Sequence, residues 1–149
     1  MVDLEKYDSL VIDIDDTLIE GWFIDFMDLT WRLFKSKVLS QLLMTIQAKF
    51  KLYRVNHRVA ELCVKAINNN IQVYFLTARG PNKGTIRMLY DILPVVNLNI
   101  IQLASYNASR DKFEWVQAHS IGKFLLIDDN LKTRLKMFEI GDTIHPKDL

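Results

Sequence analysis

Cysteine, glycine and proline are scarce in this chain of 149 residues, which contains one Cys, five Gly and three Pro. The lone Cys63 cannot form an internal disulfide and suits a reducing compartment, so we expect a cytoplasmic protein. Long apolar runs are also missing. The uncharged residues 38–48 are too few to cross a bilayer, and the N-terminus lacks the basic-then-apolar profile of a signal peptide. We therefore expect one globular domain over residues 1–149, without a transmembrane segment.

Acidic residues are absent from residues 31–60, although the net charge of the whole chain is only +1. The remainder of the chain is therefore net acidic, and its acids gather near residues 13–16 and at 128–129. A basic block beside acidic clusters is expected where a metal ion and a phosphate share a site. A solvated basic helix is the alternative. The basic residues of the block are Arg32, Lys35, Lys37, Lys49, Lys51, Arg54 and Arg58.

Four short apolar runs, at residues 10–13, 71–77, 98–103 and 124–128, predict buried strands, and residues 143–145 predict a weaker fifth. Helices are expected at 56–69, at 85–92 after a turn at Gly80-Pro81, and from Ser109 or Asp111 to about 119, closed by Gly122. Because strands and helices alternate, the fold class is α/β. We expect a three-layer Rossmann-like parallel sheet with helices on both faces.

The long segment between the first two strands has no Gly or Pro from residue 22 to residue 79, and its apolar residues recur at helical spacing. We predict a small helical insert after the first strand, at about residues 21–55. Two interpretations stay open. The insert is either a cap whose basic charge attracts anionic substrates, or a helix pair that packs on the body or on a second subunit of a homodimer. Its aromatic residues are expected in the core, with one or two at the mouth of the pocket; they are Trp22, Phe23, Phe26, Trp31 and Phe34.

The segment most indicative of chemistry is Asp13-Ile14-Asp15-Asp16-Thr17-Leu18, directly after the first apolar run. In an open parallel sheet, ligands bind at the carboxyl ends of the strands. Two carboxylates two residues apart at such an end can turn toward one site, where one binds a cation or attacks phosphorus and the other moves protons. The alternative is that these acids belong to an ordinary turn or helix cap.

This hexapeptide resembles the first motif of the haloacid-dehalogenase-like (HAD) hydrolases, Asp-x-Asp-x-Thr followed by an aliphatic residue. The string Phe-Leu-Thr-Ala-Arg at 75–79 resembles their second motif, Lys112 is placed like the lysine of the third, and Leu-Leu-Ile-Asp-Asp-Asn at 125–130 resembles the fourth. Asp16 departs from the pattern, because many members carry Gly there. The second and fourth strings also resemble, more weakly, the 5′(3′)-deoxyribonucleotidase branch.

The resemblance implies a Mg²⁺-dependent phosphatase that works through an aspartyl-phosphate intermediate. Asp13 attacks phosphorus and also binds the metal. Asp15 gives a proton to the leaving oxygen, takes one from the attacking water, and offers its backbone carbonyl as a further ligand. Asp129 is the expected direct ligand of the acidic pair, with Asp128 binding directly or through water; the sequence leaves that choice open.

The same resemblance assigns Thr77 and Lys112 to the transferring phosphoryl oxygens and Arg79 to substrate binding. Each has a simpler alternative: Thr77 is an ordinary strand-end residue, Arg79 a solvated loop residue, and Lys123 takes the place of Lys112. Cys63, on the apolar stripe of a predicted helix, is expected in the core.

The expected substrate is a nucleotide or another small phosphomonoester. Two other functions stay open. The first is a phosphatase acting on nucleic-acid ends, with the basic insert following the phosphates. The second is a non-catalytic HAD-like module that binds a partner or a membrane surface through the insert.

Overall fold

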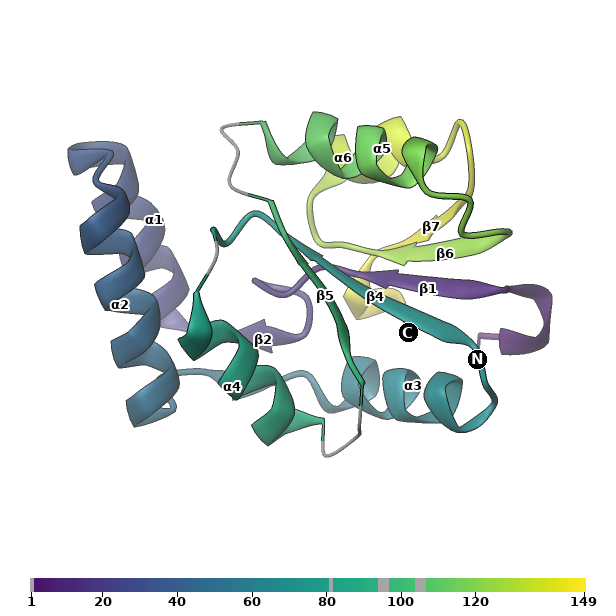
Figure 1. The fold of residues 1–149 in the computed structure, drawn as a ribbon, viewed down its shortest axis with the longest axis horizontal. Helices are drawn as coiled ribbons and strands as arrows, with labels where there is room; N and C mark the ends of the chain where they lie inside the picture. Colours follow the sequence, from purple (N-terminus) through teal and green to yellow (C-terminus); the bar gives the residue numbers. More distant parts are fainter. Residues whose placement is uncertain (1, 81, 94–96, 104–106) are drawn as a thin grey trace.

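Five parallel strands form the centre of the protein in the computed structural model, which describes residues 2–80, 82–93, 97–103 and 107–149 (Figure 1). The strand order is β5-β4-β1-β6-β7. All five predicted strands are present, including the weak fifth, so the α/β prediction is confirmed. Their bounds are Ser9–Ile12 (β1), Gln72–Thr77 (β4), Asn99–Gln102 (β5), Phe124–Ile127 (β6) and Asp142–Ile144 (β7).

Helices cover both faces of this sheet, which gives the three layers expected (Figure 1). On one face lie α3 (His57–Asn68) and α4 (Lys83–Ile92); on the other lie α5 (Ala108–Ala118) and α6 (Leu131–Met137). Strand side chains alternate between the layers. Leu10 and Ile12 of β1 pack in the cluster that includes Cys63, whereas Val11 packs with Val116 and Met137. Every residue of β1 is buried, because the strand is covered on both sides.

An asparagine caps each of the four sheet-covering helices. The side-chain oxygens of Asn56, Asn82, Asn107 and Asn130 accept a backbone N–H three residues later, at 3.1–3.4 Å. The prediction that Ser109 or Asp111 starts α5 is therefore wrong, since Asn107 caps it. Gly122 does not close α5 either, because the helix ends at Ala118. Pro81, half of the predicted turn at 80–81, lies outside the described residues.

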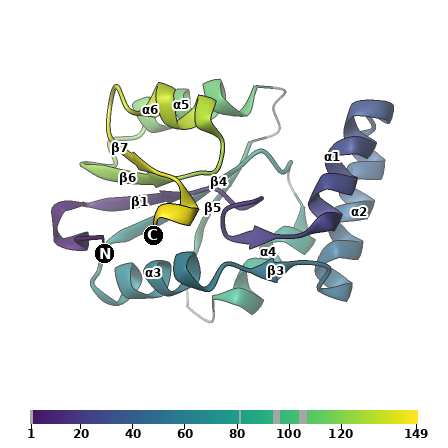
Figure 2. The ribbon, with the colours of Figure 1, turned by 180° about the vertical axis from the view of Figure 1, so that it is seen from behind.

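The insert is a helical hairpin of α1 (Trp22–Phe34) and α2 (Lys37–Phe50). At its base, β2 (Ile19–Glu20) pairs antiparallel with β3 (Arg54–Val55), a ribbon too short for periodicity to predict. Figures 1 and 2 show the hairpin beyond the carboxyl ends of the sheet strands, with α1 and α2 side by side and α2 packed against α4.

The aromatic residues of α1 were expected in the core, and this prediction is largely wrong: Phe23 is buried, but Trp22, Phe26 and Phe34 are exposed. The remaining elements are two 3₁₀ turns, η1 (Leu4–Lys6) and η2 (Pro146–Asp148). Across the described residues, no helix has the length and apolar character needed to span a bilayer.

Candidate active site

The carboxyl ends of the three central strands bring the predicted site residues together. Asp13 follows β1, Thr77 ends β4 and Asp128 follows β6. Strand β1 lies between β4 and β6. After β1 the chain first forms β4 and β5 on one side of it, and later forms β6 and β7 on the other side. This is the switch point of an open parallel sheet, the place where ligands bind in folds of this class. All three side chains are buried or nearly so.

Lys112 of α5 joins two of these strand ends. Its Nζ donates to Asp13 Oδ1 at 2.6 Å and to Asp128 Oδ2 at 2.7 Å, and the residue is 3% exposed. Lys123, the alternative weighed from the sequence, is exposed and lies with Nζ 5.5 Å from the centre of the Tyr7 ring. The structure therefore brings Lys112, and not Lys123, to the acidic cluster.

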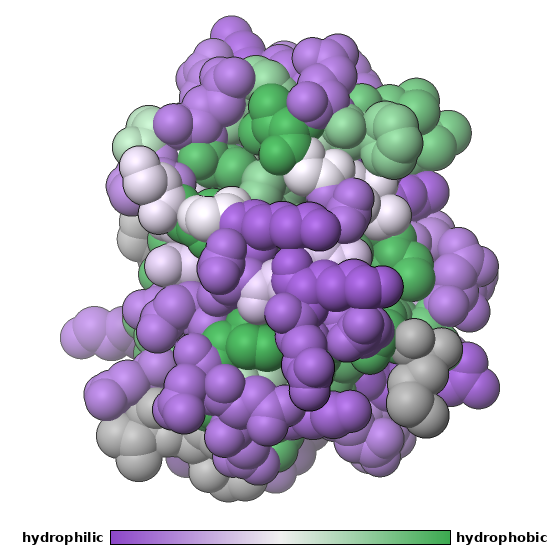
Figure 3. All heavy atoms as spheres, turned by 90° about the vertical axis from the view of Figure 1, so that its right-hand side faces the viewer, coloured by the Kyte–Doolittle hydropathy of each residue, from purple (hydrophilic) through white to green (hydrophobic). Residues whose placement is uncertain are grey.

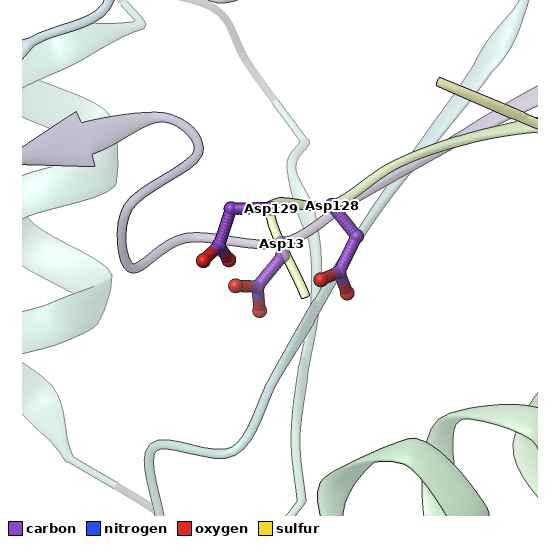
Figure 4. A group of neighbouring side chains, drawn as sticks. All are labelled: Asp13, Asp128 and Asp129. Atoms are coloured by element: carbon purple, nitrogen blue, oxygen red, sulfur yellow. The ribbon is translucent and has the colours of Figure 1, made fainter. Parts of the chain in front are cut away.

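Asp13, Asp128 and Asp129 form a compact group of acids, with one carboxylate oxygen from each lying within 4.8 Å of the others. Figure 4 shows the three carboxylates projecting toward a common space from the ends of β1 and β6. Neighbouring groups fix the chain around them. The Asp129 N–H donates to Thr17 Oγ1 at 3.0 Å, and Arg134 Nη1 donates to the carbonyls of Asp128 and Asp129 at 2.6 Å each.

Arg79, in the loop after β4, joins the loop after β1 to helix α2 of the insert. Its Nε and Nη2 donate to the two carboxylate oxygens of Asp15 at 2.8 and 2.5 Å, the paired geometry that suits a guanidinium. Nη2 also donates to Gln47 Oε1 of α2 at 2.7 Å. Arg79 is 2% exposed and Gln47 is fully buried. The backbone N–H of Arg79 donates to Thr77 Oγ1 at 3.2 Å, which fixes the loop after β4.

Burial governs the electrostatics of the Lys112 contacts. Burial raises the pKa of Asp13 to about 8. The charge of Lys112 lowers this pKa, but the charges of Asp128 and Asp15 raise it further. Burial alone would lower the pKa of Lys112, but the attraction of Asp13 and Asp128 outweighs it and the net shift is upward. The lysine therefore stays charged, whereas the raised pKa of Asp13 means that this carboxyl group ionises fully near neutral pH only when further positive charge lies close to it.

The hairpin adds mainly acids to this environment. Burial and the neighbouring charges of Asp129, Asp15, Asp25 and Asp28 raise the pKa of Asp16 to about 6. Burial, followed by Asp15, likewise raises the pKa of Asp28 in α1. The seven basic residues of the 31–60 block are all exposed, and the charge of one of them, Arg32, lowers the pKa of Asp28. Side chains of the insert that influence the site therefore include Gln47 by contact and Asp25 and Asp28 by charge, with Arg32 beside Asp28 as a partial counter-charge.

Sequence reasoning identified the acids, Thr77, Arg79 and Lys112, but it missed three supporting residues. Gln47 could not be identified from the sequence, because its contact with Arg79 depends on how α2 packs beside α4. Thr17 belongs to the quoted first motif, where its hydroxyl accepts the Asp129 N–H. Arg134 follows the acidic pair by one helical turn in α6, a position from which a long side chain reaches back to the strand end.

The donor set fits a hard divalent cation. Carboxylate oxygens are the ligands that Mg²⁺ prefers, and close carboxylates repel one another unless a cation lies between them. Asp13, Asp15, Asp16, Asp128 and Asp129 surround the strand ends, and their described cationic partners are Lys112 and Arg79. Asp128 already uses both oxygens, for Lys112 and for the Asn130 N–H at 2.8 Å. Asp13 and Asp129 are therefore better placed as direct ligands.

Comparison of the chain with protein-family models, with curated proteins and with solved structures finds no match in any of the three.

Proposed function

We propose that the protein is a Mg²⁺-dependent phosphomonoester hydrolase of the HAD type, with Asp13 as the nucleophile. The observation that carries the proposal is the contact of Lys112 Nζ with Asp13 and Asp128 at the carboxyl ends of β1 and β6. A buried lysine between two acids is costly as mere stabilisation, since a well-packed apolar group would serve as well. It has a use where a transferring phosphoryl group needs a positive charge beside the nucleophile.

The reaction proceeds in two displacements. In the first, Asp15 enters protonated, with one oxygen released from Arg79. An Asp13 carboxylate oxygen bonds to phosphorus while the ester P–O bond breaks, and Asp15 gives its proton to the leaving alcohol oxygen. In the second, Asp15 takes a proton from water, the water oxygen bonds to phosphorus, and the bond between phosphorus and Asp13 breaks. Inorganic phosphate leaves and both acids return to their starting states.

The neighbouring groups have distinct parts in this reaction. Lys112 and the Thr77 hydroxyl hold phosphoryl oxygens, as a fixed charge and a fixed donor. Asp13 and Asp129 would hold Mg²⁺ directly, with the Asp15 carbonyl as a further ligand and Asp128 orienting Lys112. The metal supplies charge neutralisation, so that an anionic carboxylate can approach an anionic ester.

Arg79 is better placed to position Asp15 than to bind the substrate phosphate. Both Asp15 oxygens accept from Arg79, so proton transfer to a leaving group requires one of these bonds to open. Nη2 is shared with Gln47, which gives Arg79 a second acceptor when its bond to Asp15 Oδ1 opens. We expect the substrate to be a nucleotide or another small phosphomonoester.

The test is turnover of p-nitrophenyl phosphate by wild type and by Asp13→Asn, with Mg²⁺ and with EDTA. We expect the variant and the chelated wild type to be inactive, because an amide neither attacks phosphorus nor balances the metal's charge. Asp91→Asn, which changes an exposed acid of α4, is the matched control and should keep full activity. Turnover by Asp13→Asn, or undiminished turnover in EDTA, would contradict the proposal.

A second measurement separates metal binding from phosphoryl binding. Asp129→Ala should weaken Mg²⁺ binding in a calorimetric titration, whereas Thr77→Ala should leave Mg²⁺ binding intact and raise KM. A screen of nucleotides, sugar phosphates and 3′- and 5′-phosphorylated oligonucleotides with Mg²⁺ then identifies the substrate class. Equal Mg²⁺ affinities for the two variants would remove Asp129 from the ligand set.

A further inference from the structure

Helix α1 exposes four large apolar side chains in one line. Trp22, Phe26, Leu29 and Leu33 are 69, 44, 55 and 68% exposed, and we call them the α1 stripe. Their spacing of four, three and four residues places them on one face of a helix. Monomeric proteins rarely expose contiguous apolar surface of this kind without using it. Figure 3 shows the opposite end of the molecule, where hydrophilic residues cover much of the surface and apolar residues reach it mainly toward the top.

The packing of the hairpin explains why the protein's own core does not cover this stripe. Phe23 and Ile24, on the other side of α1, are buried. Helix α2 packs against α4, whereas α1 packs chiefly against α2, its neighbour in the hairpin (Figures 1 and 2). Four-three spacing is the pattern of the seam in a coiled coil, where each apolar side chain fits between side chains of a facing helix.

The charges beside the stripe identify the facing helix. Asp25 and Arg32 are exposed, lie seven residues apart and therefore flank the stripe on the same side. In an antiparallel pair of identical helices, side chains on matching flanks face each other across the seam. Pairing Trp22 with Leu33 of the second copy, and Phe26 with Leu29, leaves Asp25 and the second copy's Arg32 only about 3 Å apart along the axis, at 1.5 Å per residue.

We infer that α1 packs antiparallel against α1 of a second copy of this chain, around a two-fold axis near the middle of the helix. A two-fold interface requires a self-complementary surface, and an apolar line flanked by one acid and one base has this property. An anionic membrane fits α1 less well, because this helix carries two exposed acids, Asp25 and Asp28, against one exposed base, Arg32, and the other exposed bases of the hairpin lie beyond α1. The inference does not depend on the proposed hydrolase activity.

The interface is small, so the dimer should be weak. The 13-residue α1 spans about 20 Å at 1.5 Å per residue, and interfaces that bury less than about 1,200 Å² in total belong to the transient class. We expect a dissociation constant on the order of 1–100 μM. Sedimentation velocity from 2 to ~300 μM, a range chosen around that estimate, should show wild type passing from monomer to dimer.

Two apolar variants test the stripe. Leu33→Glu should remain monomeric over the whole range, because it places a charge in the seam. Leu135→Glu is the matched control, since Leu135 of α6 is 64% exposed on another part of the surface. It should dimerise like wild type. A wild-type protein that is monomeric throughout, or a Leu33→Glu variant that dimerises normally, would overturn the inference.

Charge exchange tests the antiparallel arrangement. Asp25→Arg and Arg32→Asp should each weaken self-association at least about tenfold, a factor of ten being 1.4 kcal/mol, because like charges then meet. An equimolar mixture of the two variants should form a heterodimer, and the double variant should return to near-wild-type affinity. A mixture that associates no better than its components would refute the pairing. Co-sedimentation of wild type with vesicles containing phosphatidylserine, abolished by Leu33→Glu, would assign the stripe to a membrane instead.

Discussion

Replacing Lys112 by methionine is the perturbation that the structure predicts most sharply. The ammonium contacts Asp13 and Asp128 at 2.6 and 2.7 Å, and all three residues are buried. Methionine keeps most of the side-chain volume and removes the charge. Two buried carboxyl groups then face each other with no cation between them.

The expected cost is large because a buried pair is being broken. Removing one partner of such a pair costs about 3–5 kcal/mol, which corresponds to a fall in Tm of roughly 6–20 °C for a chain of this size. Protonation of the acids relieves part of this cost, so the loss should be greater at pH 9 than at pH 6. Activity should fall further, by about 10²–10³ in kcat/KM, the cost of removing one group that stabilises the transition state.

The assay is urea unfolding followed by circular dichroism, in EDTA and again with Mg²⁺, beside turnover of p-nitrophenyl phosphate. Lys123→Met is the matched control and should change the unfolding free energy by less than about 0.5 kcal/mol, as exposed substitutions usually do. Mg²⁺ should stabilise Lys112→Met more than it stabilises wild type, since it replaces the lost charge. Equal stability and activity of the two lysine variants would refute the assignment of Lys112.

Three further predictions concern other parts of the chain. Burial raises the pKa of Cys63 to about 12, so a thiol reagent at pH 8 should react with the urea-unfolded protein and not with the native one; rapid native labelling would contradict its place in the core. Gly141→Ala should cost about 1–3 kcal/mol of unfolding free energy, because the new methyl group overlaps the Phe124 ring, and Phe124→Leu in the same chain should recover part of that loss. The folded-state pKa of Asp16 is raised to about 6 from 3.8, chiefly by burial and by Asp129, so in EDTA the unfolding free energy should fall as pH rises from about 4 to about 6. Asp16→Asn should flatten that pH dependence, and an unchanged slope would remove Asp16 as its source.

Much of the fold could be predicted because sheet strands covered on both faces are nearly continuous apolar runs. Leu10, Val11 and Ile12 of β1 illustrate this, since every side chain in the strand is buried. The same runs locate the strand ends, and in a parallel sheet the strand ends locate the crevice. Asp13, Thr77 and Asp128 could therefore be grouped before any coordinate was known.

The contacts of the insert could not be predicted, because they depend on how distant elements pack. Gln47 is a polar residue in an amphipathic helix, and nothing local distinguishes it from the exposed Gln41 one and a half turns earlier. Its side chain is buried because α2 packs against α4, beside the loop that carries Arg79. The sequence pattern fixes the helix but not the neighbour that the helix meets.

The wrong prediction for the aromatic residues of α1 has the same cause: the sequence pattern does not show which surface a helix face contacts. Trp22, Phe26, Leu29 and Leu33 have the spacing of a buried helix face, and periodicity alone does not say whether the covering surface belongs to the same chain. Phe23 and Ile24 show that α1 already has a buried face toward its own protein. A second apolar line on the same short helix therefore exceeds what the monomer needs. Scattered exposed apolar residues are ordinary, whereas a continuous line with matched flanking charges is specific. The failure of the core prediction at Trp22 and Phe26 thus marks a surface whose pattern is completed by a second molecule.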